Sequence, residues 1–218
     1  MGSGNIRQKA RFSVNDAFDR FYRSLAPSVT RIDYTQHLSN NYNFSINQLM
    51  VHNPMSQGEL LEDISKKAAA AQSDFAIAIA FSWRLKTLDC MSDEACENLT
   101  GLFLFAVVNL DRRSLLSLFV RCPNIKSLTL AYMDATDAEF LFQAFVEGKL
   151  QSLKYIEVSH ASDECIAAMK FAPNLSKIVF RFPDKNITDA GFKHLVQGGG
   201  GKHLLSIEVS DKSHDWLT

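Results

Sequence analysis

The chain shows no excess of either charge. Its 218 residues carry 23 Lys and Arg against 24 Asp and Glu, which gives a formal net charge of −1 at pH 7. A protein that binds nucleic acid mainly through its phosphates carries an excess of basic residues, so the composition argues against nucleic acid as a partner. Tyrosine and tryptophan are scarce, with 5 Tyr and 2 Trp against 16 Phe. This bias is typical of a dry interior rather than of a stacking or sugar-binding surface.

Long apolar segments are absent as well. The longest apolar runs, at 75–81 and 102–108, are far shorter than the roughly 18 to 20 residues that a membrane-spanning helix needs. The N-terminus has no apolar core of the kind found in signal peptides. We therefore expect a protein without a membrane partner, located in the cytoplasm or the nucleus.

Cysteine is too sparse for a disulfide scaffold, with four in the whole chain. No two cysteines form a CxxC pair, and each lies beside apolar residues: Cys90, Cys96, Cys122 and Cys165. Such thiols behave as small apolar side chains, so we expect all four to be buried and reduced, as in an intracellular protein.

Residues with reactive side chains do not follow a known catalytic or metal-binding spacing. None of the six histidines belongs to an HxxxH or HExxH motif. There is no GxSxG motif, and the glycine run 198–201 before Lys202 lacks both the first Gly and the final Ser or Thr of a phosphate-binding loop. We predict no catalytic residue, no metal and no cofactor. An enzyme with a site that these motifs do not reveal is the alternative.

One short pattern recurs along the chain: an apolar residue, two variable residues, an apolar residue, one variable residue and a third apolar residue. The clear copies are Leu85–Cys90, Ile125–Leu130, Leu153–Val158, Leu175–Phe180 and Leu204–Val209, and weaker copies are Val29–Tyr34 and Ile46–Val51. We interpret each copy as a β-strand. Signals for a helix start follow several copies, among them the capping box Thr136–Glu139 and the related Thr188–Gly191.

Further helices are expected from apolar stripes with helical spacing. One runs from Val14 to Leu25 and ends near Pro27, another starts at Ser56, and the segment 93–122 is expected to hold two helices divided near Asn109. A strand–turn–helix unit cannot bury its apolar faces alone, but stacked copies can. The sequence therefore predicts an α/β fold, with one parallel sheet on the concave side and helices on the convex side.

The expected organisation is a single repeat domain over 1–218. Within it we predict a capping helix over 1–27, weak or atypical repeats over 28–83, clearer repeats over 84–210 and a short tail over 211–218. Because a repeat array must hide its terminal core from water, we expect the first helix to seal the end of the array.

The copies beginning at Leu85, Ile125, Leu153, Leu175 and Leu204, together with the helix entry Ile187–Phe192, resemble leucine-rich repeats. The likeness is to the ribonuclease-inhibitor-like and cysteine-containing subclasses and covers most of 84–210. It implies an irregular solenoid that binds another protein. Since the subclass often follows an F-box, it also implies substrate recognition in ubiquitin ligation, although no F-box segment is visible here. An α/β domain of another kind is the open alternative.

If the repeats stack, the variable strand positions form columns on the concave face. Lysines fill the first column on three copies, carboxylates lie three residues further on in two of them, and one tyrosine lies at the centre: Lys86, Lys126, Lys154, Asp89, Glu157 and Tyr155. Neighbouring strands are roughly 4.8 Å apart, so the lysines would span about 10 Å. We predict that this face binds a protein or peptide. The alternatives are that the charges merely keep the sheet soluble, or that Lys86, Lys126 and Lys154 bind nucleic acid.

Overall fold

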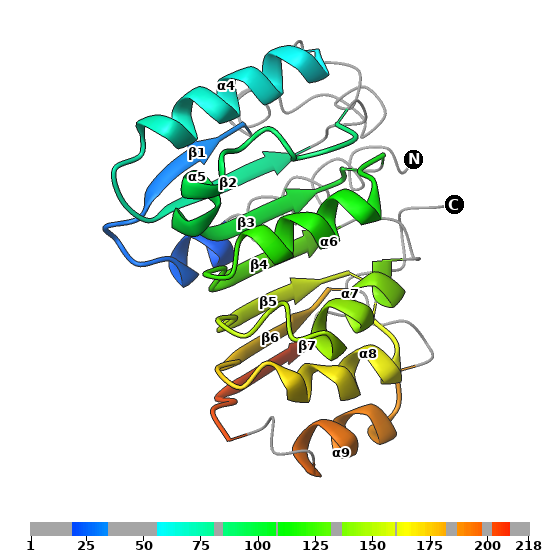
Figure 1. Cartoon of the computed structure of the whole chain (residues 1–218). Helices are drawn as coiled ribbons and strands as arrows, with labels where there is room; N and C mark the ends of the chain where they lie inside the picture. The colour runs from blue at the N-terminus through cyan, green and yellow to red at the C-terminus, as the bar shows by residue number, and fades with distance from the viewer. Residues whose placement is uncertain are drawn as a thin grey trace, which may run out of the picture.

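A computed structural model of the chain describes residues 19–34, 56–80, 85–107, 109–131, 137–159, 161–181, 187–197 and 202–209. Within these residues, the strands form one parallel sheet whose spatial order is the chain order (Figure 1). The strands are β1 (Thr30–Asp33), β2 (Phe75–Ala80), β3 (Leu99–Phe105), β4 (Ser127–Ala131), β5 (Tyr155–Val158), β6 (Lys177–Phe180) and β7 (Ser206–Val209). The helices are α4 (Gln57–Ala70), α5 (Asp93–Asn98), α6 (Arg112–Arg121), α7 (Asp137–Val146), α8 (Asp163–Ala168) with the 3-10 turn η1 (Met169–Phe171), and α9 (Asp189–Gln197). The prediction of an α/β fold with a parallel sheet is confirmed.

The later strands follow the repeated pattern closely. Leu128 of β4 pairs in register with Ile156 of β5, Ile156 with Ile178 of β6, and Ile178 with Ile207 of β7. The first three of these side chains are fully buried in the core between the sheet and the helices. The predicted strands at 125–130, 153–158, 175–180 and 204–209 are therefore confirmed, and they lie side by side.

Helix starts follow the predicted chemistry where they are described. Ser56 and Glu59 form a reciprocal capping box at the start of α4, as expected. Ser162 accepts a hydrogen bond from the backbone N–H of Cys165 at the start of α8, and Thr188 precedes α9. The capping box at Thr136, the weak copy Ile46–Val51 and the tail 211–218 lie outside the described residues.

Two strands, β2 and β3, form at positions where the repeated pattern did not predict a strand. The copy Leu85–Cys90 is not a strand: Leu85 and Leu88 lie in the helix-side core without regular secondary structure. The preceding residues form β2 instead, and Leu99–Phe105, expected to be helical, forms β3. Every residue of β2 and β3 is buried. Strands covered on both faces are apolar throughout, so they lack the alternation of apolar and polar residues on which the prediction relied.

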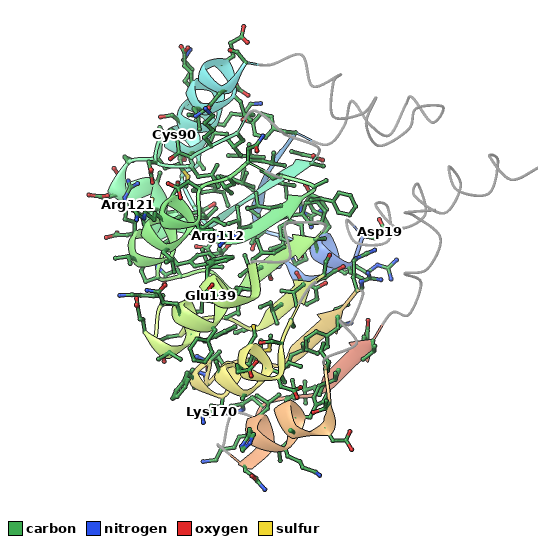
Figure 2. The ribbon with its side chains drawn as sticks, turned by 90° about the vertical axis from the view of Figure 1, so that its right-hand side faces the viewer. Asp19, Cys90, Arg112, Arg121, Glu139 and Lys170 are labelled. Carbon is green, nitrogen blue, oxygen red and sulfur yellow. The ribbon has the colours of Figure 1, made fainter. Side chains whose placement is uncertain are left out.

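The second cover of these strands comes from the N-terminal segment. Residues 19–24 are helical, and Phe21, Leu25 and Val29 pack against Ala76, Ala78, Ala80, Phe103 and Phe105. Figure 2 shows the two layers that cover the sheet. Asp19 of the N-terminal segment lies on one side, and Glu139 of α7 and Lys170 lie on the other. The described part of the expected capping helix thus covers a sheet face rather than sealing the end of the array.

A close approach between this segment and the sheet explains one glycine. A Cβ atom at Gly101 of β3 would lie 2.7 Å from Leu25 Cδ2 and 2.8 Å from the Cβ of Ala76. The small side chains of β2 and the missing side chain at position 101 together leave a flat sheet surface. Phe21 and Leu25 pack against this surface. The ring of Phe21 lies 5.2 Å from that of Phe103.

Candidate functional site

Two of the three predicted surface lysines lie side by side. The backbone N–H of Lys154 donates to the backbone oxygen of Lys126 at 2.8 Å, just before β5 and β4 begin. Both side chains are exposed. Lys126 Nζ lies 3.0 Å from Asp74 Oδ2, and the two side chains are 47% and 49% exposed. Lys154 makes no ion pair with any described residue.

Lys86 does not extend this column, which corrects the sequence prediction. Its backbone oxygen accepts a hydrogen bond from Asp111, the residue that caps the start of α6, whereas Lys126 follows the end of that helix. The two lysines therefore lie toward opposite ends of the sheet. Asp89 belongs to the same connection as Lys86, where its carboxylate accepts hydrogen bonds from Thr87 and Ser114. Neither residue is part of the strand surface.

Tyr155 and Glu157 lie on the predicted sheet face, but that face is not open there. Tyr155 is 4% exposed and Glu157 is 0% exposed, because the segment beginning at Asp19 crosses the strands above them. The expectation that Tyr155 is an exposed anchor for a partner is wrong in this structure. Ser24 Oγ of the covering segment donates a hydrogen bond to Ser127 Oγ of β4 at 3.0 Å.

The carboxylate of Glu157 is the centre of a buried polar cluster. Arg20 Nη2 donates to Glu157 Oε1 at 3.1 Å, and Arg181, just after β6, donates from Nε to the same oxygen. The Tyr155 hydroxyl donates to Oε2 at 2.6 Å. We call these four residues the Glu157 cluster. Three segments far apart in the sequence meet at one carboxylate.

The electrostatics of the cluster follow from burial. Removal from water raises the pKa of Tyr155 well above its usual value, and the adjacent negative charge of Glu157 raises it further. The phenol therefore stays neutral and remains a hydrogen-bond donor. Two guanidinium groups and a phenol satisfy a carboxylate that would be costly to bury alone. This arrangement can hold the N-terminal segment on the sheet.

Five charged residues lie near the amino ends of the strands. We call this the amino-end rim: Asp74, Lys126, Lys154, Lys177 and Glu208. Lys177 Nζ lies 2.5 Å from Glu208 Oε1 across β6 and β7, with side chains 34% and 45% exposed. Sequence reasoning found Lys126 and Lys154 but not Asp74, Lys177 or Glu208 as parts of one surface. Lys177 and Glu208 occupy variable positions of the copies Leu175–Phe180 and Leu204–Val209, so the repeated pattern does place them on the sheet surface.

The four cysteine side chains lie on the helix side of the sheet. Cys96, Cys122 and Cys165 are buried, Cys90 is half-buried, and all four are free. A hydrogen bond between the thiols of Cys96 and Cys122 lowers the pKa of Cys96 and raises the pKa of Cys122. Figure 2 places Cys90 and Arg121 on the same side of the molecule. Among the described residues, no group of three or more His, Cys, Asp or Glu side chains is placed to hold a metal ion.

Comparisons with known proteins do not assign a family. No protein-family model matches the chain, and no curated protein matches it significantly. In the described part of the chain, no helix is both long and apolar enough to cross a membrane.

Proposed function

We propose that this chain is a non-enzymatic interaction module, an adaptor of the leucine-rich-repeat type that recognises another protein. Two features support the repeat assignment. The strands follow one another in the sheet in chain order, and four consecutive strands, β4 to β7, share the pattern of two variable residues between apolar ones. A role in ubiquitin ligation follows from the resemblance alone.

The observation that carries the proposal is the amino-end rim. Because the Glu157 cluster and the segment above it close the central sheet face, a partner must engage a part of the sheet that stays exposed. At the rim, Lys126 and Lys154 immediately precede the neighbouring strands β4 and β5, and Lys154 has no carboxylate partner among the described residues. An acidic segment of a partner protein would complete this surface. Exposed charges of this kind contribute more to specificity and association rate than to affinity.

Affinity purification with charge-reversed variants tests the proposal. The double variant Lys126→Glu/Lys154→Glu should lose proteins that the wild-type chain retains, by about tenfold or more. The matched control is Lys66→Glu, since Lys66 is exposed on α4 and pairs with Glu62 in its own helix. Circular dichroism should be the same for all three proteins. Retention of the same proteins by the double variant would contradict recognition at the rim.

A further inference from the structure

The last strand leaves its core positions uncovered. On β4, β5 and β6, the side chains that point toward the helices are almost fully buried: Leu128 0%, Leu130 2%, Ile156 0%, Val158 1%, Ile178 0% and Phe180 1%. On β7, the residues in the same register are Ile207 and Val209, which are 41% and 55% exposed. The sheet therefore ends on a strand with an open apolar side.

Within the described ranges, the apolar side of β7 lacks the helix that covers the corresponding side of β6. Phe180 of β6 is covered by Phe192 of the following helix, α9, with ring centroids 5.9 Å apart. No described element covers Val209 in the same way. Among the described residues, β7 also pairs with β6 alone, so no described strand satisfies the backbone N–H and C=O groups of its other edge.

The two edges of the sheet differ. On β1, the side chains of Thr30 and Arg31 are exposed, but the core position Ile32 is 4% exposed. On β7, polar and apolar residues alternate, with Ser206 and Glu208 on one side and Ile207 and Val209 on the other. Lys177 already compensates Glu208. In the described part of the chain, only the β7 edge combines a backbone without a strand partner with uncovered core positions, which disfavours head-to-tail pairing of β7 with β1.

We propose that β7 pairs in antiparallel fashion with β7 of a second copy of this chain, with Ile207 opposite Ile207 at the twofold axis. Directly opposed residues of an antiparallel pair lie on the same face. This register places Leu205 opposite Val209, and Ser206 opposite Glu208, so that apolar residues meet apolar ones. A shift by one residue would oppose Ile207 to Glu208, and a shift by two would oppose Glu208 to itself. This register therefore opposes apolar residues to apolar ones without placing the two Glu208 side chains against each other.

A second copy suits the observations because this complementarity is internal to β7. The chain's net charge of −1 adds little long-range repulsion between copies. Pairing satisfies the free backbone groups of both strands and brings the exposed Ile207 and Val209 of each copy against those of the other. This inference does not depend on the amino-end rim.

The molar mass of the full chain in solution tests the pairing. Light scattering after size exclusion, from about 1 to 100 µM, should show a mass that rises toward twice the 24.4 kDa of one chain. Ile207→Lys and Val209→Lys should each shift the dimer to monomer. The control is Val120→Lys, since Val120 of α6 is 56% exposed and lies away from β7. A monomeric wild type at every concentration, or a dimer that survives both β7 variants, would overturn the proposal.

A cross-linking experiment tests the register separately. In Ile207→Cys, the two introduced thiols face each other at the axis, so a short thiol-reactive cross-linker should produce a covalent dimer. In Leu205→Cys, the thiol lies opposite Val209 and should give little dimer. The wild-type chain measures the background from its own four cysteines. Equal cross-linking of both variants would refute the proposed register.

Discussion

Arg20 and Glu157 are 137 positions apart in the sequence, and their side chains meet at 3.1 Å beneath the N-terminal segment. Glu157 is fully buried, while the Arg20 side chain is 17% exposed. The carboxylate also accepts from Arg181, whose side chain is 3% exposed. One carboxylate therefore ties the N-terminal segment to two neighbouring strands of the sheet.

Glu157→Gln should destabilise the fold strongly, because it removes the negative charge that two largely buried guanidinium groups share. Removing one partner of a buried ion pair costs about 3–5 kcal/mol. Arg20→Met should cost less, since Arg20 is partly exposed and Arg181 still binds the carboxylate. Urea denaturation of both single variants and the double variant measures the coupling between the two residues. A loss for Glu157→Gln no greater than that for Arg20→Met would contradict the central role of the carboxylate.

Gly101→Ala should also destabilise the chain, because its new Cβ would overlap Leu25 and Ala76. Overpacking of this kind costs about 1–3 kcal/mol. The compensating double variant Ala76→Gly/Gly101→Ala should recover part of the loss. Gly58→Ala serves as the control: nothing lies within 4 Å of its added Cβ, so it should stabilise α4 by up to about 1 kcal/mol. Thermal unfolding of the four proteins measures these differences, and equal stability of the two single variants would argue against close packing at Gly101.

The sequence predicted the later part of the sheet because β4 to β7 keep polar residues at most of the variable positions. It did not predict β2 and β3, since a helix layer on one side and the N-terminal segment on the other leave both strands almost entirely apolar. The signal was present in another form. Residues 75–80 alternate between large and small apolar side chains, and the stripe containing Phe21 and Leu25 required an apolar face to cover.

The candidate surface was harder to predict for a different reason. Glu157 and Tyr155 occupy positions that are exposed in an uncovered parallel sheet, so their pattern alone indicates a soluble face. What buries them is a segment distant in sequence, and such long-range contacts leave no local periodicity. Lys86 was misplaced because three apolar residues with the right spacing also occur in an extended connection that packs beneath α6.

Cys90 should be the thiol that reacts first in the folded chain. It is half-buried, whereas Cys96, Cys122 and Cys165 are buried. Burial raises the pKa of Cys90 above its usual value, and the thiolate is the reactive form, so the rate of labelling should still increase with pH above about 8.5. Alkylation followed by peptide mass spectrometry identifies the site, and Cys90→Ser is the control. Faster labelling of Cys96 would show that α5 opens before the thiol of Cys90 reacts.

Asp163 connects two successive helices. It is the first residue of α8, and its carboxylate accepts hydrogen bonds from the backbone N–H of Thr188 at 2.8 Å and from the Thr188 hydroxyl, just before α9. These hydrogen bonds lower the pKa of Asp163 below its usual value. The close approach also fixes Gly191, where a Cβ would lie 2.8 Å from Asp163 Oδ1.

The sign of the pH effect follows from that lowered pKa. The ionised carboxylate favours the folded state, so its stabilisation is complete above the unfolded value of about 3.9 and is lost as the pH falls through the lower folded value. Asp163→Asn should therefore be less stable than the wild type at pH 7, and the difference should shrink below about pH 4. Asp189→Asn changes the first residue of α9, which has no hydrogen-bond partner in another described element, and should show a smaller difference at pH 7. Urea denaturation across this pH range decides the matter, because a gap between wild type and Asp163→Asn that does not change with pH would mean that the charge contributes nothing.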